Sequence, residues 1–170
     1  REVRAVTLSA LQPFPGAVLW DIGAGCGSVA IEWMRAAARA SAFAIEDNDA
    51  RIAMTVQNAK ALGVPELTII KGNAPAALKN LPEPDAIFIG GGITDQGVFE
   101  TAFAALKPNG FLVANAVTAQ GEARLLALAD AHNGSLSRIA VSRVEAVGSF
   151  TAFKPMMPVT MLTIRKKRPV

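Results

Sequence analysis

A glycine-rich turn between an apolar run and a helical pattern is the feature that most constrains this fold. Residues 17–22 form an apolar run that predicts a buried parallel strand, and the pattern from Ser28 onward predicts a helix. Gly23, Gly25 and Gly27 stand at alternate positions between them. Glycine permits positive φ and lets a ligand approach the backbone, while the helix start offers unpaired N–H groups. The sequence therefore predicts an α/β fold that holds a ligand at this turn.

The spacing of these glycines favours one class of ligand over another. A dinucleotide-binding turn has Gly-x-Gly-x-x-Gly, with a pyrophosphate at the helix N-terminus. Here the third glycine comes one residue early, and Asp21 precedes the first by two residues. The Asp21 carboxylate would repel a pyrophosphate but could accept a hydrogen bond from an ammonium group. The alternative is a glycine-rich connection in another kind of α/β protein, because short motifs also match by chance.

A second acidic position lies where the next strand is predicted to end. The apolar run 42–45 leads directly into Glu46, nineteen residues after the last of the three glycines. An acid at about this spacing accepts hydrogen bonds from ribose hydroxyls in nucleotide-binding folds. We interpret the following Asp47 and Asp49 as an acidic helix start that the macrodipole favours, with Asp47 or Asn48 as the cap.

Two later loops complete the predicted binding edge, because loops at the carboxyl ends of parallel strands line the ligand crevice. After a strand at 67–70, Asn73 and the backbone of Ala74 are placed to read a base, although an Asx turn explains Asn73 equally well. After a strand at 85–89 come Gly90 to Gly92. Each glycine costs about 0.5–1 kcal/mol relative to alanine in a regular element, which a close backbone approach to a ligand would explain.

The remaining pattern predicts helices and strands that support this edge. We expect helices at 2–11, 28–38, 50–62, 95–106 with Thr94 as cap, and 119–131, a strand at 111–115, and final strands at 136–144 and 159–164 that form an antiparallel hairpin. The loop 145–158 carries apolar side chains that either cover a flat substrate or pack on the sheet. His132 follows a predicted helix, where a cation is an ordinary stabilising feature rather than a sign of catalysis.

Composition narrows the class of protein. A length of 170 residues fits one domain, and Cys26 is the only cysteine. We find no membrane-length apolar run, signal peptide or metal-ligand cluster, so we expect a cytoplasmic protein without a metal. The formal charge is +3, but the run 165–168 supplies four positive charges and leaves the rest close to neutral. We therefore expect a solvated basic end, and no binding to nucleic acid or membrane.

Together these motifs resemble a known family. The glycine turn resembles motif I of the class I S-adenosylmethionine-dependent methyltransferases. More specifically, the chain up to about Lys167 resembles the decarboxylating precorrin C15-methyltransferase family of cobalamin biosynthesis. The segments that carry this resemblance are 2–9, 21–27, 43–46, 72–75, 90–91, 115–118 and 158–160. The first and last lie outside the generic cofactor motifs and are therefore the specific ones.

The resemblance implies a fold and a set of site residues. The fold is the Rossmann-like class I methyltransferase α/β fold, a mostly parallel seven-stranded sheet with an antiparallel edge hairpin. The single domain divides into an N-terminal helix (1–15), a cofactor-binding core (16–132) and a C-terminal hairpin with a substrate-side loop (133–170). With the spacing arguments, the expected cofactor contacts are Asp21, Gly23, Ala24, Gly25, Cys26, Gly27, Glu46, Asn73, Ala74 and Gly90, and the expected substrate contacts are Gly91, Asn115, Thr118 and Met157. Two positions depart from the family pattern: Asn73 replaces an Asp, and Met157 replaces an Asn.

The family's reaction methylates C15 of a precorrin and removes CO₂ from the C12 acetate, with S-adenosylmethionine as donor and S-adenosylhomocysteine as product. We assign no catalytic residue, because the sulfonium is already activated and the protein mainly aligns donor and acceptor. Arg4, Arg143 and Lys154 are either partners for substrate carboxylates or surface charges. We also expect a homotetramer and a fused N-terminal tetrapyrrole methylase domain. The alternatives are a tRNA (adenine) methyltransferase and a non-catalytic cofactor-binding module.

Overall fold

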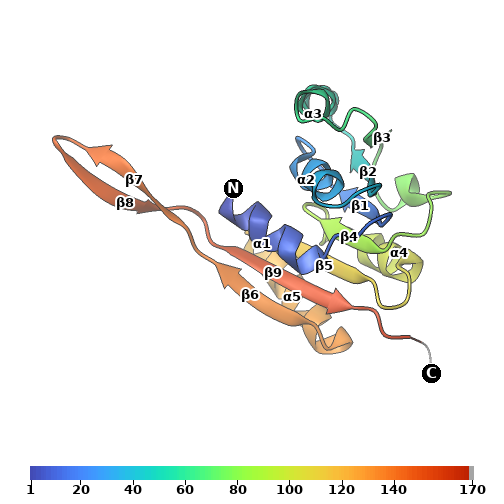
Figure 1. Cartoon of the computed structure of the whole chain (residues 1–170). Helices are drawn as coiled ribbons and strands as arrows, with labels where there is room; N and C mark the ends of the chain where they lie inside the picture. The colour runs from blue at the N-terminus through green and yellow to red at the C-terminus, as the bar shows by residue number, and fades with distance from the viewer. Residues whose placement is uncertain (169–170) are drawn as a thin grey trace.

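The computed structural model describes residues 1–168 as a seven-stranded sheet with helices on both faces and a long hairpin that extends away from it (Figure 1). Several elements follow from a local pattern in the chain. For example, the side chain of Asn48, one of the two caps that the sequence offers, accepts a hydrogen bond from the Arg51 N–H and caps the third helix. The elements in order are α1 (Glu2–Leu11), β1 (Val18–Ile22), α2 (Ser28–Ala36), β2 (Ser41–Glu46), α3 (Asp49–Ala61), β3 (Thr68–Lys71), η1 (Ala76–Leu78), β4 (Ala86–Ile89), α4 (Val98–Ala105), β5 (Phe111–Ala116), α5 (Ala119–His132), β6 (Ser135–Ile139), β7 (Ser142–Val147), β8 (Phe150–Pro155) and β9 (Val159–Arg165).

The strand order positions a ligand crevice in the middle of the sheet. The order is β3-β2-β1-β4-β5-β9-β6, with β1 to β5 parallel and β9 antiparallel to both β5 and β6. The predicted mostly parallel seven-stranded sheet with an antiparallel edge is therefore confirmed. The chain moves outward from β1 through β2 to β3 and then returns to the other side of β1 as β4. Ligands of open α/β sheets bind at such a switch point, beyond the carboxyl ends of the strands.

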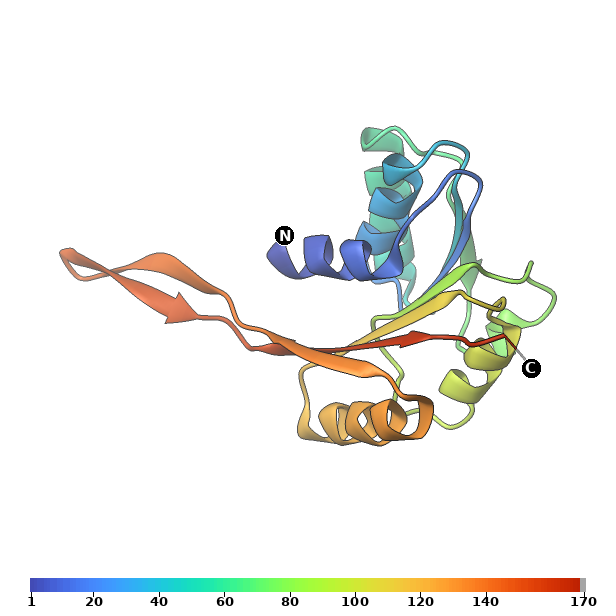
Figure 2. The ribbon, with the colours of Figure 1, turned by 60° about the horizontal axis from the view of Figure 1, so that its bottom comes forward.

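Two hydrophobic cores hold the layers together. On one face of the sheet α1, α2 and α3 pack over a core in which Trp33 is fully buried, and on the other face η1, α4 and α5 cover a second core (Figure 2). Side chains alternate along β1, so that Leu19 joins the first core while Trp20 and Ile22 join the second. Among residues 1–168, no helix combines the length and the apolar character needed to cross a membrane.

The segment after α5 differs most from the prediction. The expected strand 136–144 is two strands, β6 and β7, and the expected loop 145–158 contains a further strand, β8. Strands β7 and β8 pair with each other in a separate two-stranded sheet that extends far from the body (Figures 1 and 2). We call residues 142–155 the hairpin arm. Its large apolar side chains do not pack on the main sheet, since Phe150 is 78% exposed and Phe153 is 74% exposed.

Three smaller details refine the expected boundaries and roles. Helix α4 begins at Val98 after Gly97, without a side-chain cap, so the prediction that Thr94 caps it is wrong. His132 ends α5 and packs its ring against Phe103, with centroids 4.8 Å apart, which agrees with a structural role. The basic end is not simply solvated, because the Lys166 ammonium donates to three carbonyls at the C-terminal end of α4, at 2.6–2.9 Å.

Candidate functional site

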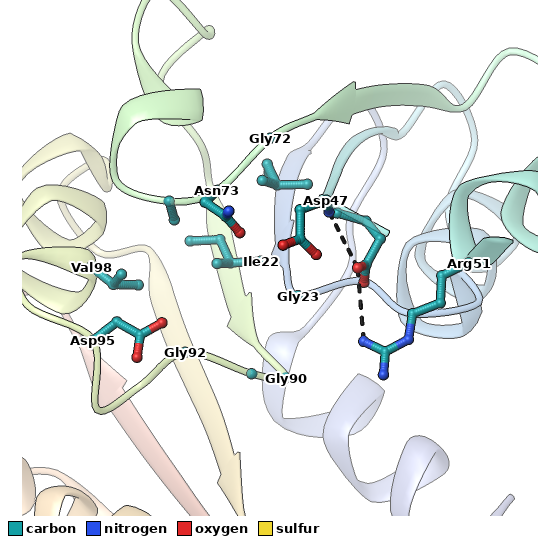
Figure 3. A pocket seen from close by; sticks show the side chains of 14 residues that line it. Ile22, Gly23, Asp47, Arg51, Gly72, Asn73, Gly90, Gly92, Asp95 and Val98 are labelled. Carbon is teal, nitrogen blue, oxygen red and sulfur yellow. Dashed lines mark hydrogen bonds and ion pairs between the residues drawn. The ribbon is translucent and has the colours of Figure 1, made fainter. Parts of the chain in front are cut away.

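A cavity opens at the switch point, where the carboxyl ends of β1, β2, β3 and β4 meet. Four loops contribute to it, and several polar side chains point into it (Figure 3). The lining residues are Ile22, Gly23, Ile45, Glu46, Asp47, Arg51, Gly72, Asn73, Ala74, Gly90, Gly91, Gly92, Asp95 and Val98. We call this the first cavity.

The glycine turn is held against two neighbouring strands. The N–H groups of Gly23 and Ala24 both donate to the Ile45 carbonyl of β2, at 3.0 and 3.1 Å. Gly23 has φ of +70°, and a Cβ at this position would lie 2.9 Å from the backbone nitrogen of Gly91. Glycine is therefore required at position 23 because two backbone turns pack directly together there, whatever ligand the cavity holds.

Helix α3 supports the same turn from behind, which the sequence analysis did not anticipate. The buried Thr55 hydroxyl donates to the Gly25 carbonyl at 2.9 Å, and the Asn58 amide donates to the Cys26 carbonyl at 3.0 Å. A Cβ at Gly27 would lie only 2.5 Å from the Thr55 methyl group. The conformation of the turn thus depends on residues about thirty positions away. No local sequence signal identifies Thr55, since a threonine inside a helix has no fixed role.

Glu46 lies where the sequence predicted, at the last position of β2, in the wall of the first cavity. It is 4% exposed, and one carboxylate oxygen accepts from the Gly25 N–H at 2.8 Å. The other oxygen accepts from the N–H groups of Asp47 and Asn48, at 3.2 and 3.1 Å. Four lone-pair sites are available on a carboxylate, so the oxygen bound to Gly25 can still accept from a ligand hydroxyl.

Asp21 lies beneath the turn and does not line the first cavity. Its carboxylate is 1% exposed, and one oxygen accepts from the Ala30 N–H at 2.9 Å, which ties β1 to α2. The other oxygen has no hydrogen-bond partner within residues 1–168. Burial raises the pKa of this carboxyl to about 7, the Ala30 bond opposes the rise, and the nearby charge of Glu46 adds to it. Its predicted contact with an ammonium group stays a prediction, and its place beneath the turn gives it a supporting role.

The first cavity also contains polar residues that the sequence analysis did not select. Arg51, in the first turn of α3, pairs with Glu46 at 3.7 Å. Asp47, which we had interpreted as part of the helix start, points into the cavity, as does Asp95 from the loop after β4 (Figure 3). The Asn73 amide also faces this space (Figure 3). An Asx turn at Asn73 would need the N–H of residue 75, which is a proline, so the structure argues against that alternative. Three carboxylates against one guanidinium make the cavity acidic.

A second cavity lies on the other side of the glycine turn, between α1 and the ends of β4 and β5. Gly23 and Gly90 line both cavities and separate them. The other residues of its wall are Arg1, Val3, Arg4, Thr7, Ala24, Ser28, Val29, Phe88, Asn115, Ala116, Val117 and Val159. The Asn115 amide donates to the buried Thr7 hydroxyl at 3.0 Å, which fixes α1 over the end of β5.

The predicted site residues do not all lie in one place. Gly23, Glu46, Asn73, Ala74, Gly90 and Gly91 line the first cavity, and Ala24 and Asn115 line the second. Gly25, Cys26 and Gly27 form the turn without lining either. Thr118 caps α5 by accepting from the Gly121 N–H at 3.2 Å, and Met157 is 68% exposed beyond the hairpin arm. Within residues 1–168, no three His, Cys, Asp or Glu side chains are grouped to hold a metal.

Comparison with known proteins agrees with this arrangement. The profile of a family described as the precorrin methyltransferase domain matches residues 1–166. A precorrin-6Y C(5,15)-methyltransferase [decarboxylating] from Sinorhizobium is 54% identical over 160 residues, which cover 94% of this chain and 39% of that protein. The match to a relative from Mycobacterium tuberculosis covers 42% of that protein's length. The chain therefore spans about two fifths of the length of these curated relatives.

Solved structures extend the comparison to the fold. The targeted domain of a putative precorrin-6Y C5,15-methyltransferase from Corynebacterium diphtheriae has a TM-score of 0.89 at 43% identity, over 97% of this chain and 96% of that one. The C-terminal domain of the corresponding Rhodobacter capsulatus protein has a TM-score of 0.90 at 38% identity, over 97% and 89%.

Proposed function

The chain belongs to the precorrin methyltransferase domain family, and from this membership we propose that it methylates C15 of a precorrin with S-adenosylmethionine and removes the C12 acetate carboxylate as CO₂. The observation that carries the proposal is the pair of cavities that meet at Gly23 and Gly90. A donor in the first cavity and an acceptor in the second would face each other across this pair of glycines.

The charge of the first cavity supports S-adenosylmethionine as the donor. Glu46, Asp47 and Asp95 line it together with one arginine, Arg51. A pyrophosphate would be repelled by this acidic wall, whereas ribose hydroxyls and a cationic amino-acid end would be attracted. We assign the ribose hydroxyls to Glu46 and the adenine to Asn73 and the backbone of Ala74.

The walls of the second cavity support a large, partly apolar acceptor. Val29, Phe88, Ala116 and Val159 give it apolar surface near the two glycines. Such a wall excludes water from part of the acceptor, and a carboxylate that enters a dry site loses CO₂ more readily. The departing carboxyl leaves its bonding electrons on the acetate carbon, which takes up a proton to become a methyl group.

The chemistry asks little of individual side chains. The sulfonium of S-adenosylmethionine supplies an activated methyl group, and an electron-rich macrocycle carbon accepts it. The protein therefore contributes alignment, which can account for about 7–11 kcal/mol of a barrier when reacting atoms are held in contact. The rigid glycine turn, bound to β2 and supported by α3, provides that alignment.

The direct experiment incubates the chain with S-adenosylmethionine and a late precorrin that keeps its C12 acetate. Mass spectrometry should show one added methyl group and the loss of one CO₂. A mixture without S-adenosylmethionine is the control and should show neither change. Methyl gain without carboxyl loss would overturn the decarboxylating assignment. Methylation of tRNA with an unchanged tetrapyrrole would transfer the assignment to a tRNA methyltransferase.

We also propose that the chain forms a homotetramer through the hairpin arm. Cross-strand pairing places Val144, Ala146 and Phe153 on one face of the arm, while Glu145 and Lys154 lie on the other, together with Val147 and Phe150 near the tip. An isolated two-stranded hairpin is marginally stable in water, so a ribbon with an exposed apolar face gains stability by packing against copies of itself. The face that carries Val144 and Phe153 has no charged side chain among residues 142–155, so this face of one arm can pack against the same face of another copy.

The tetramer has a simple test in solution. Light scattering should report four chains for the wild type. Phe153→Lys, on the apolar face, should reduce the assembly, whereas Ala152→Lys, on the opposite face, should leave it intact. A wild type that stays monomeric at micromolar concentration would contradict the proposal.

A further inference from the structure

We propose that Arg4 binds a carboxylate of the tetrapyrrole substrate at the second cavity. The inference rests on the proposed function, because it names the group that holds the acceptor side of the same site. It is carried by the position of Arg4 on α1, by the charges around the second cavity and by the partners of the neighbouring cations.

Arg4 occupies a position on α1 that normally belongs to the core. Thr7 is fully buried and Leu11 is 1% exposed, and both lie on the face of the helix that packs on the sheet. Arg4 precedes Thr7 by three residues and Leu11 by seven, so all three share one helical face. Its side chain is 37% exposed and lines the second cavity. An anionic partner stabilises a cation in such a half-buried position, because even partial burial costs it some solvation.

The protein itself supplies that partner only weakly. The nearest carboxylate of Arg4 is Glu32, at 4.0 Å, and the same Glu32 oxygen already accepts from Arg35 at 3.1 Å. Among residues 1–168, no acidic side chain lines the second cavity, whereas Arg1 and Arg4 both do. The two cavities therefore differ in sign, since the first is acidic and the second is basic. A ligand that carries carboxylates matches the second cavity and not the first.

The other two cations that the sequence suggested for substrate carboxylates are already paired. Arg143 on the hairpin arm donates to Glu2 at 2.7 Å, and Lys154 donates to Glu145 at 2.9 Å. Neither residue lines either cavity. Of the three cations that the sequence suggested for substrate carboxylates, the structure thus favours Arg4 alone. A guanidinium also suits this role, because its fork of N–H groups matches a carboxylate in two-bond geometry.

The test compares Arg4→Gln with Arg35→Gln in the full chain. Arg35 is a matched control, because it pairs with the same Glu32 but lies exposed on α2, outside both cavities. The probe is uroporphyrin, a stable tetrapyrrole polycarboxylate, whose binding is followed by its fluorescence. We expect Arg4→Gln to raise the Kd about tenfold or more, as expected for a lost charged hydrogen bond. Arg4→Lys should have an intermediate Kd, and Arg35→Gln should stay within about twofold of wild type.

Two further measurements separate the proposed contact from a general structural effect. S-adenosylhomocysteine should bind Arg4→Gln and wild type equally, because it occupies the first cavity. The methyl ester of uroporphyrin should bind wild type weakly, because it has no charge to pair. The inference is overturned if Arg4→Gln binds uroporphyrin like wild type, if both ligands weaken equally, or if the ester binds as tightly as the acid.

Failure of the inference can be told apart from failure of the proposed function. If wild type methylates the precorrin and Arg4→Gln keeps the same KM and the same uroporphyrin Kd, the function stands and the inference falls. If wild type does not methylate the precorrin but binds uroporphyrin through Arg4, the inference stands and the proposed reaction falls.

Discussion

Gly27→Ala tests whether Thr55 fixes the conformation of the glycine turn. Gly27 has φ of +76°, and an added Cβ would lie 2.5 Å from the Thr55 methyl carbon and 3.2 Å from its hydroxyl oxygen. The left-handed conformation costs an alanine about 1–2 kcal/mol, and overpacking of a buried site costs about 1–3 kcal/mol more. Reduced freedom of the unfolded chain returns about 0.4–1 kcal/mol. We therefore expect the free energy of unfolding to fall by about 2–4 kcal/mol.

Two control variants separate the backbone strain from the clash. Gly25 has φ of +59°, but an added Cβ there meets nothing within 4 Å, so Gly25→Ala should cost only the strain. Thr55→Ser removes the methyl group and keeps the hydroxyl that donates to the Gly25 and Arg51 carbonyls. Combined with Gly27→Ala, this change should recover most of the overpacking cost, about 1–3 kcal/mol.

Urea unfolding measures the costs of strain and overpacking separately. The proteins compared are wild type, Gly27→Ala, Thr55→Ser and their double variant, with Gly25→Ala measured in parallel. The double-mutant cycle should give a coupling of at least about 1 kcal/mol, because the two side chains would touch directly. The reasoning is refuted if Gly25→Ala and Gly27→Ala cost the same and the coupling energy is near zero.

Two further predictions concern the carboxylates near the turn. Glu46→Gln should weaken S-adenosylhomocysteine binding by about 1.5–3 kcal/mol in calorimetry, because it removes the charge of a buried acceptor. Asp49→Asn should have little effect, since Asp49 pairs with Lys71 at the surface. Equal losses of affinity in the two variants would contradict the assignment of the ribose to Glu46. Burial raises the pKa of Asp21 from 3.8 to about 7, so the folded state holds this proton more tightly than the unfolded state and stability should fall as pH rises through that window. The free energy of unfolding should fall by at most about 4 kcal/mol. Asp21→Asn should make stability less dependent on pH, because it removes the titrating group. The prediction is refuted if thermal unfolding between pH 5 and 8 shows the same pH dependence for wild type and Asp21→Asn.

Much of the binding edge could be predicted because its signals are local. A strand that runs into alternate glycines, an acid at the end of the next strand and an Asn cap before a helix each depend on a few adjacent residues. The order of these elements then implies a parallel sheet, and the sheet places their loops together. Gly23, Glu46 and Asn73 were therefore found from the sequence, and all three line the first cavity.

What the sequence by itself determined is thus the sheet, its ligand edge and the family. Only the tertiary structure decided what depends on contacts between distant segments. Thr55 supports Gly25, Lys166 binds the end of α4, and Asp21 is enclosed beneath the turn, and no local pattern announces any of these. The hairpin arm was missed because its alternation resembles that of a strand or an apolar loop until strand pairing is known. The basic second cavity likewise exists only because α1 folds over the end of β5, where one inward-facing arginine meets no strong acidic partner.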